Sequence, residues 1–437
     1  MPDELAWYAQ RRAVYSGNNE VDLLHGGDEL FPAMCQAIDG AIYEIWMATY
    51  IFHIDAWGER VMKALCDAAR RGVRVRVVVD GFGSLHSRPW LEHKFGDAGV
   101  QLAVFSPVTR WWHSLRPANL RRLHQKLCVV DGDIGFVGGI NIIDDRIDLR
   151  HGVSDTPRLD FAVRARGPLV SPIEYTARAV WWRAEFGRDW RAEIADVARS
   201  SKPVVHAKRL LRQVRLTPPA GDPQAAFGGD NSTEDLSDDA PRLAPVRAAF
   251  VIRDNIRQRR TIERSYIEAI RNARERVDIV CPYFYPGRAF RRVLDDAARR
   301  GVRVRLVLQG KLDYRFAGLA ASVLYDELLA RGVHIFEYMP AFLHAKVAVV
   351  DSHWATVGSS NIDPLSLLLN LEANVVIDDE AFVTTLADQI EVAVEASRPV
   401  GSAQVRKRTW QVRLQRRFVA WIAHAYLRAA GSAAGHY

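Results

Sequence analysis

The sequence predicts an α/β fold in which one structural unit occurs twice in tandem. Two motifs of identical spacing, "HQKLCVVD" and "HAKVAVVD", begin 220 residues apart at His124 and His344. Upstream of each lies a second duplicated stretch, since "AARRGVRVRVVVDG" from Ala68 reappears as "AARRGVRVRLVLQG" from Ala297. Such self-similarity indicates a repeated unit. Strand and helix patterns alternate within each copy, which is typical of a layered fold with a mixed, largely parallel sheet.

Each element of the unit has a local signal. In the first copy, the apolar run at 44–52 predicts a strand, and a helix ends at an Arg-Gly pair before a second apolar run at 73–80. That run lacks strict alternation, as expected for a strand buried on both faces. A further helix leads to Gly99 and a third strand. The second copy repeats this order from the strand at 277–285 to Gly332.

This pattern divides the chain into four parts. The first lobe spans residues 1–215 and the second spans 246–400. Between them, 216–245 is rich in Pro, Gly, Asp and Ser and lacks hydrophobic periodicity, which predicts a linker or disordered loop. Residues 401–437 form a basic tail. Because each lobe carries one motif, we expect a pseudo-two-fold arrangement with a single active site between the lobes.

The tail holds seven Lys or Arg and no acid, so it accounts for the whole net charge of +7. Its large apolar residues, among them Trp410, Phe418 and Trp421, recur at helical steps. This favours a basic amphipathic helix on an anionic membrane surface. The alternative is a C-terminal helix docked on the core with solvated arginines. Nucleic acid is a poorer third partner.

The composition is that of a globular protein, with 437 residues of which 49% are hydrophobic and 25% charged. The sequence shows neither a signal peptide nor an apolar stretch of about 18 residues, so we expect a chain that is neither exported nor anchored through the bilayer. The cysteines show no CxxC pairing, which favours reduced thiols and a cytosolic setting. They are Cys35, Cys66, Cys128 and Cys281.

The duplicated motifs place histidine and lysine on one strand face. Residues two apart along a strand point to the same side, so Lys126 accompanies His124 and Lys346 accompanies His344. A lone histidine on an apolar strand is usually a core residue, but this does not explain two copies in register. Two histidines and two lysines in one pocket would repel one another unless an anion normally lies at the centre, and a phosphodiester is such an anion.

The remaining motif residues have less direct roles. Asp131 and Asp351 lie at an odd offset from their histidines, before residues typical of hairpin turns. We expect them first to hold the turn and only second to take part in the chemistry. A small-residue run that ends in asparagine follows each motif, and its amide groups suit phosphate oxygens. The candidate phosphate-binding residues are Gly139, Asn141, Ser359 and Asn361.

The paired histidines predict a double displacement at phosphorus. One neutral imidazole attacks while the other, protonated, delivers a proton to the leaving oxygen, and the resulting phosphohistidine is then transferred to an acceptor. The motifs lack a carboxylate cluster for Mg²⁺, so no metal or other cofactor is expected. Asp160 and Glu372 occupy corresponding positions after their motifs and are candidates to orient the histidine rings. The alternative is that they are surface or turn carboxylates, which fits Glu372 less well because apolar residues flank it.

In these residues the chain resembles the phospholipase D superfamily, whose signature is HxKxxxxD followed by a Gly/Ser-rich segment and Asn. Both copies match it. The stretch "HWATVGSSNIDPLSLLLNLEANVVI" from His353, together with "YFYPG" and "KRTW", is similar to bacterial cardiolipin synthases of the B type, the branch without N-terminal transmembrane helices. The resemblance covers nearly the whole chain. Two segments depart from the family pattern, Asp145 to Arg158 and the linker after Leu216.

The resemblance implies two phospholipase D-like lobes and the transfer of a phosphatidyl group between two phosphatidylglycerol molecules, which gives cardiolipin and glycerol. It also implies a peripheral protein on the cytoplasmic side of the inner membrane, and it assigns the attack to the N-terminal histidine. One chain suffices for the site because it carries both motifs. The catalytic roles of the family carry over to His124, Lys126, Asp131, His344, Lys346 and Asp351.

Other activities share these motifs. The relatives include hydrolases and enzymes that exchange other headgroups, so a phospholipase D-type hydrolase is the first alternative. A metal-independent nuclease would use the basic tail on a nucleic-acid backbone, although no nucleic-acid partner is expected. A non-catalytic membrane scaffold conflicts with two intact motifs. Aromatic and basic residues near the first motif, including Trp111 and Trp112, favour contact with lipid headgroups or form a loop packed on the core.

Overall fold

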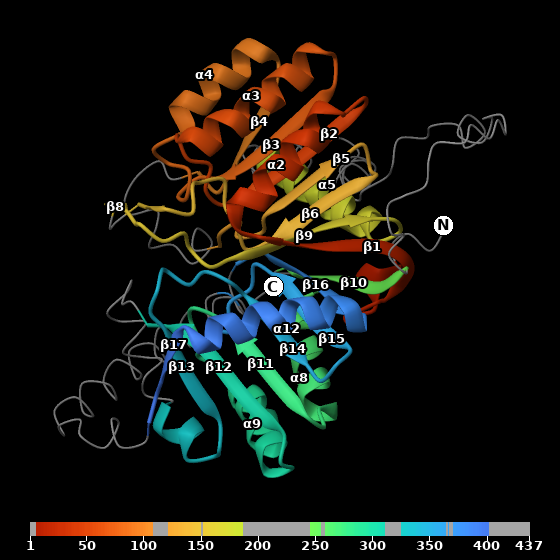
Figure 1. Cartoon of the computed structure of the whole chain (residues 1–437). Helices are drawn as coiled ribbons and strands as arrows, with labels where there is room; N and C mark the ends of the chain where they lie inside the picture. Colours follow the sequence, from red (N-terminus) through yellow and green to blue (C-terminus); the bar gives the residue numbers. More distant parts are fainter. Residues whose placement is uncertain are drawn as a thin grey trace, which may run out of the picture.

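The computed structural model of the chain has two α/β lobes joined through one continuous sheet (Figure 1). It describes residues 6–107, 121–149, 152–186, 245–254, 258–310, 325–363, 366 and 370–401. The predicted linker up to residue 244, the tail beyond residue 401, and Trp111 with Trp112 lie outside the described residues, so these expectations remain predictions.

The first lobe follows the predicted alternation of strands and helices. A short helix α1 (Ala6–Ala9) precedes it. Its strands are β1 (Ser16–His25), β2 (Glu44–Thr49), β3 (Arg74–Asp80), β4 (Gln101–Phe105), β5 (Leu127–Val130), β6 (Ile134–Gly138), β7 (Ile147–Asp148), β8 (Gly152–Val153) and β9 (Phe161–Arg166). Its described helices are α2 (Gly26–Asp39), α3 (Ala56–Arg70), α4 (Arg88–Ala98) and α5 (Val170–Phe186).

The second lobe repeats this order, which confirms the duplication. Its strands are β10 (Val246–Arg253), β11 (Arg276–Val280), β12 (Arg303–Gln309), β13 (His334–Tyr338), β14 (Val347–Val350), β15 (Trp354–Gly358), β16 (Glu372–Asp378) and β17 (Ser397–Pro399). Its described helices include α8 (Thr261–Asn272), α9 (Arg288–Arg299) and α12 (Glu380–Glu395).

The strands form one mixed sheet in the order β17-β13-β12-β11-β14-β15-β16-β10-β1-β9-β6-β5-β2-β3-β4. The antiparallel pair β1 and β10 joins the lobes, and the order outward from this pair is equivalent in both directions, except that β17 has no counterpart beyond β4 among the described strands. Among the described strands, β2, β3 and β4 pair in parallel, as do β11, β12 and β13, the strands that the repeat predicts. The other neighbours are antiparallel, so the sheet is mixed but less parallel than expected, because tight hairpins such as β5–β6 reverse the chain.

The duplicated sequence "ARRG" has the same structural role in both lobes. In the first lobe the guanidinium of Arg71 donates to the carbonyls of Ile38 and Asp39 at the end of α2, where helix carbonyls lack partners. Arg300 does the same for α8 in the second lobe. Gly72 and Gly301 follow with φ of 96° and 88°, a left-handed conformation that favours glycine and ends the helix.

The two lobes share one hydrophobic core on one face of the sheet and have separate cores on the other face. Helices α2, α3 and α4 cover one face of the first lobe's strands, and α8 and α9 cover the equivalent face in the second lobe. On the other face, α5 and α12 pack into a single apolar core that includes side chains of both lobes. The sheet curls at β1 and β10, so that β6 and β9 lie against β15 and β16. This brings the two motif regions together.

Candidate active site

The two motif histidines face one another where the lobes meet. The ring centroids of His124 and His344 are 6.5 Å apart, with the planes at 60°. Each histidine lies three residues before its strand, β5 or β14, and is held by the other lobe. The amide of His124 donates to the carbonyl of Leu371 (3.0 Å), and that of His344 donates to the carbonyl of Leu159 (2.9 Å). Reacting atoms approach to about 3 Å before bonding, so this gap suits one phosphorus atom between the rings.

Each histidine is hydrogen-bonded to a buried carboxylate of the opposite lobe. Nδ1 of His124 lies 3.0 Å from Oε2 of Glu372, and Nδ1 of His344 lies 2.6 Å from Oδ2 of Asp160. The carboxylates are at most 1% exposed. A carboxylate on Nδ1 keeps the proton there and leaves Nε2 as the reactive nitrogen. Asp160 and Glu372 are therefore placed to orient the rings, in a crossed arrangement.

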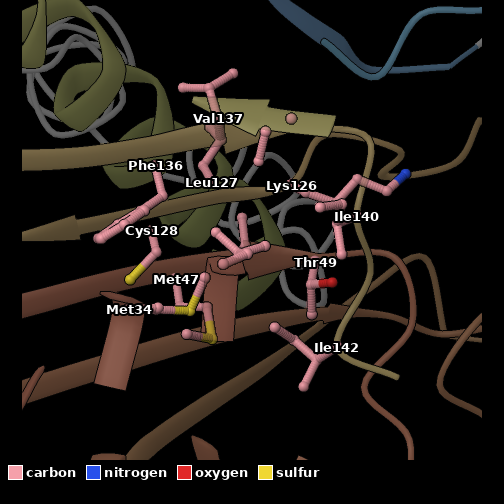
Figure 2. Close-up of a pocket in the computed structure, with 14 residues that line it drawn as sticks. Met34, Met47, Thr49, Lys126, Leu127, Cys128, Phe136, Val137, Ile140 and Ile142 are labelled. Carbon is pink, nitrogen blue, oxygen red and sulfur yellow. The ribbon is translucent and has the colours of Figure 1, made fainter. Parts of the chain in front are cut away.

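The motif lysines lie beside the histidines and are almost fully buried, with 6% of Lys126 and 1% of Lys346 exposed. Nζ of Lys126 donates to the carbonyl of His124 at 2.6 Å, and Lys346 makes the same contact with the carbonyl of His344. The ring of Tyr50 lies 5.2 Å from the His124 ring and beneath the Lys126 ammonium. Figure 2 shows this ammonium turned away from the apolar cavity lined by Met34, Met47 and Cys128. That cavity is part of the first lobe's hydrophobic core and is separate from the candidate active site.

The electrostatics of the site favour a bound anion. Burial lowers the pKa of both imidazoles, that of His344 to about 3, which favours the uncharged form of each ring in the free protein. Burial also lowers the pKa of Lys126 to about 7 and that of Lys346 to about 8. Burial alone would raise the pKa of Asp160 and Glu372, but the adjacent histidines and lysines keep both below the usual range. A phosphodiester between the rings would stabilise every protonated group around it.

We expect binding of a phosphodiester to take up protons. Above pH 7 in the free protein Lys126 is partly uncharged, and the anion restores its charge, so affinity should fall as pH rises through 7 to 9, by up to about tenfold per unit. Calorimetric titration with a dialkyl phosphate in buffers of different ionisation enthalpy measures this uptake, because that ligand stays monoanionic. Lys126→Met should lose part of the uptake, and His344 and Lys346 account for the rest, whereas exposed Lys63→Met should lose none. If the wild-type protein takes up no protons when it binds the dialkyl phosphate, this electrostatic account is wrong.

The motif aspartates lie at the other end of their strands and hold the fold. Asp131, at φ 52°, follows β5, and its carboxylate accepts hydrogen bonds from the amides of Ile42, Tyr43 and Glu44 at 2.7, 2.8 and 2.8 Å. Asp351 does the same after β14 for three amides, those of Arg274, Glu275 and Arg276. These carboxylates fasten the starts of β2 and β11 to the hairpins. They make the contacts of the turn-holding role expected first, and the catalytic role that the resemblance implies stays a prediction.

Replacing Asp131 by asparagine should therefore cost stability and leave the chemistry largely intact. Asparagine tolerates the positive φ but offers one neutral acceptor for three amides, so we expect a loss of roughly 2 kcal/mol in the free energy of unfolding. Denaturant titration measures this loss, with exposed Asp133→Asn as the control in the same turn. A variant of unchanged stability that has lost its activity would instead indicate a direct chemical role.

The predicted phosphate-binding residues separate into two groups. Gly139 packs against Asp160, since a Cβ there would lie 2.2 Å from the carboxylate, and the Ser359 hydroxyl donates to Glu372 at 2.6 Å. Both therefore support the orienting carboxylates. The Oδ1 atom of Asn141 accepts from the amide of Ile51 at 3.2 Å, and that of Asn361 lies 3.7 Å from the Cys281 thiol. Their side-chain N–H groups remain the candidates for phosphate oxygens.

Asp80 is a residue of the site that sequence reasoning missed. It is fully buried at the end of β3, and its carboxylate accepts from the amides of Leu123, Phe82 and Gly83 at 2.9, 2.8 and 3.1 Å. It thus positions the residue before His124. In the second lobe Gln309 takes this place and accepts from the amide of Leu343 at 2.6 Å. The signal was present, because "VVVDG" and "LVLQG" differ at this polar position.

The duplicated lobe and the facing histidine–lysine pairs define a phospholipase D-like protein. Residues 34–152 and 266–393 match the family model described as "Cardiolipin synthase, PLD-like domain". The chain belongs to this family. It is 35% identical over 394 residues to cardiolipin synthase B of Escherichia coli K12, covering 90% of this chain and 84% of the relative. With cardiolipin synthase A of Pseudomonas fluorescens SBW25 it is 32% identical, covering 87% of this chain and 70% of the relative.

A solved structure shows the same fold at greater distance. The phosphatidylserine synthase of Haemophilus influenzae superposes with a TM-score of 0.62 over 97% of both chains, at 12% sequence identity. The two-lobed arrangement is thus shared by proteins whose sequences have diverged widely. Among the described residues of this chain, no helix is long and apolar enough to cross a membrane.

Proposed function

We propose that this protein is a phosphatidyltransferase that makes cardiolipin from two phosphatidylglycerol molecules and releases glycerol. The observation that carries the proposal is the pair of imidazoles 6.5 Å apart, each held by a carboxylate of the opposite lobe, in a chain 35% identical to a cardiolipin synthase. The geometry supports two-step substitution at one phosphorus atom, and the relatives support a phospholipid as the donor.

In the first step, Nε2 of His124 attacks the phosphorus of the donor, in the role that the family resemblance gives to the N-terminal histidine. His344, protonated when the anion binds, gives its proton to the departing glycerol oxygen. The P–O bond to glycerol breaks as the P–N bond forms, which leaves a phosphatidyl-histidine. The ammonium groups of Lys126 and Lys346 offset the charge on the non-bridging oxygens.

In the second step, the neutral His344 takes the proton of a hydroxyl on a second phosphatidylglycerol. That oxygen attacks the phosphorus, the P–N bond breaks, and cardiolipin leaves with His124 restored. Proton and phosphatidyl group are both conserved, so no redox partner or net proton donor is needed. A crossed carboxylate behind each ring suits this exchange of roles, because each histidine is stabilised in turn as an imidazolium.

The test is incubation of the purified protein with labelled phosphatidylglycerol in mixed micelles that contain a chelator. Cardiolipin and glycerol in equal amounts are expected. Phosphatidic acid as the main product would establish hydrolysis, the alternative carried by the same site geometry. Absence of either product, in protein shown to be folded, would overturn the proposal. A phospholipid substrate also places the protein at the membrane, and we propose a peripheral association on the cytoplasmic side.

A further inference from the structure

Exposed apolar side chains are concentrated in segments that follow strands on the active-site side. The described residues include ten large hydrophobic side chains that are exposed, and six of them follow the strand ends on the active-site side. We call these six the apolar rim; they are Ile54, Phe82, Leu85, Leu149, Val153 and Met339. The other four, Ile42, Tyr43, Trp182 and Val392, are spread over the start of β2 and over α5 and α12.

The loops that carry the rim are hydrogen-bonded to one another. The Ser84 hydroxyl donates to the carbonyl of Tyr50 at 3.0 Å and accepts from the amide of Phe52 at 3.0 Å, which joins the loop after β3 to the loop after β2. The carboxylate of Asp55 accepts from the amide of Asp144 at 3.1 Å, which joins the same loop to the segment after β6. Five of the six rim residues therefore belong to one connected unit of the first lobe.

The rim is also connected to the catalytic groups. The Tyr50 ring contacts His124, and the Arg122 guanidinium, two residues before His124, lies 5.2 Å above the Phe82 ring. The β7–β8 hairpin leads directly into the second carboxylate, since Leu159 and Asp160 follow it and Asp160 holds His344. A surface that contacts the rim would thus lie beside the site.

The β7–β8 hairpin is the most exposed part of the rim. Val153 is 82% exposed and Leu149 is 52% exposed. The hairpin lies at the margin of the molecule, level with the boundary between the lobes (Figure 1). Apolar side chains gathered on one exposed edge are typical of an interaction site rather than of ordinary surface. The segment falls within Asp145 to Arg158, where the sequence departs from the family pattern.

We propose that the apolar rim inserts into the interface of a phospholipid bilayer and so presents the catalytic pocket to lipid headgroups. This inference rests on the proposed function, because a phospholipid substrate is what places a bilayer at this edge. Residues 144–158 contain four Asp against three Arg, so attraction to anionic lipid is not what holds the hairpin there. Burial of apolar surface drives the insertion, and the contact should withstand high salt and neutral lipid.

Site-specific labelling tests the insertion directly. The four native cysteines are buried and free, so a cysteine introduced at an exposed position can be labelled selectively. We would attach an environment-sensitive fluorophore through Val153→Cys and, as the matched control, through Ile42→Cys, which is 69% exposed before β2. With phosphatidylcholine vesicles in 0.5 M salt, about three times physiological ionic strength, the probe at 153 should shift to the blue and the probe at 42 should not. No shift at 153, or equal shifts at both positions, would overturn the proposal.

A second experiment separates docking from chemistry. The double variant Leu149→Ser with Val153→Ser should sediment with phosphatidylcholine vesicles roughly tenfold less than the wild type, whereas Ile42→Ser with Val392→Ser should match it. On a short-chain phosphatidylglycerol below its micellar concentration, both variants should keep wild-type activity. Undiminished vesicle binding by the hairpin variant would overturn the proposal. A wild-type protein that inserts but forms no cardiolipin would uphold the rim and refute the proposed function.

Discussion

Replacing either His124 or His344 by alanine is expected to lower phosphatidyl transfer by about 10⁴-fold or more, because one is the nucleophile and the other the proton carrier. Both variants should remain folded, since each buried carboxylate keeps another donor: Ser359 for Glu372 and the amide of Phe161 for Asp160. Turnover of labelled phosphatidylglycerol measures the loss. Exposed His93→Ala, on α4, is the control and should match the wild type.

A substrate with a good leaving group should distinguish the two histidines. A phosphatidyl ester of nitrophenol needs no proton on its leaving oxygen, so His344→Ala should still release one equivalent of nitrophenolate in a burst. His124→Ala should release none, because nothing attacks phosphorus. The reverse result would exchange the two roles. If neither variant shows a burst while the wild type turns the ester over, the covalent route is wrong.

Removing the charge of either crossed carboxylate, Glu372 or Asp160, should have the second largest effect on phosphatidyl transfer. Glu372→Gln and Asp160→Asn keep the size of the side chain but remove the charge that holds Nδ1–H and stabilises the imidazolium. We expect kcat to fall by about 10² to 10⁴-fold in each variant. Exposed Glu92→Gln, which removes only a helix-surface ion pair, is the control and should have little effect.

The pH profile distinguishes this positioning role from a general structural one. Without its carboxylate the partner histidine binds a proton less tightly, so its pKa falls. In Asp160→Asn the limb of the kcat profile that requires protonated His344 should therefore move to lower pH. In Glu372→Gln the limb that requires neutral His124 should move to lower pH. A uniform loss of activity with an unmoved profile would indicate that the carboxylates only support the fold.

Much of the fold was predictable because its signals are local. The repeat predicted two equivalent lobes, and buried apolar runs predicted β3 and β12, whose parallel neighbours the structure confirms. The odd offset of Asp131 and Asp351 separated them from the histidine face, and the structure places them at the hairpins. The share of antiparallel pairing was underestimated, because a strand pattern does not reveal which neighbour a strand will have.

Functional detail was harder to predict where it depends on contacts between distant segments. Gly139 and Ser359 occupy the same motif position and suggested phosphate binding, yet each serves a carboxylate: Gly139 by making room for Asp160, and Ser359 by donating to Glu372. Asp80 lies 44 residues before His124 and gave only the mismatch with Gln309 as a signal. The linker, the tail and the Trp111–Trp112 segment remain predictions.

The sequence by itself predicted which side chains meet, because spacing along a strand decides which side chains share a face, and the duplication required two such faces. It therefore predicted that His124, Lys126, His344 and Lys346 form one site, for which we propose phosphodiester chemistry. Only the tertiary structure decided how the halves complete each other. The sheet curls at β1 and β10, so that Glu372 serves His124 and Asp160 serves His344. Pairing across lobes arises from packing between segments up to 248 residues apart, which no local pattern encodes.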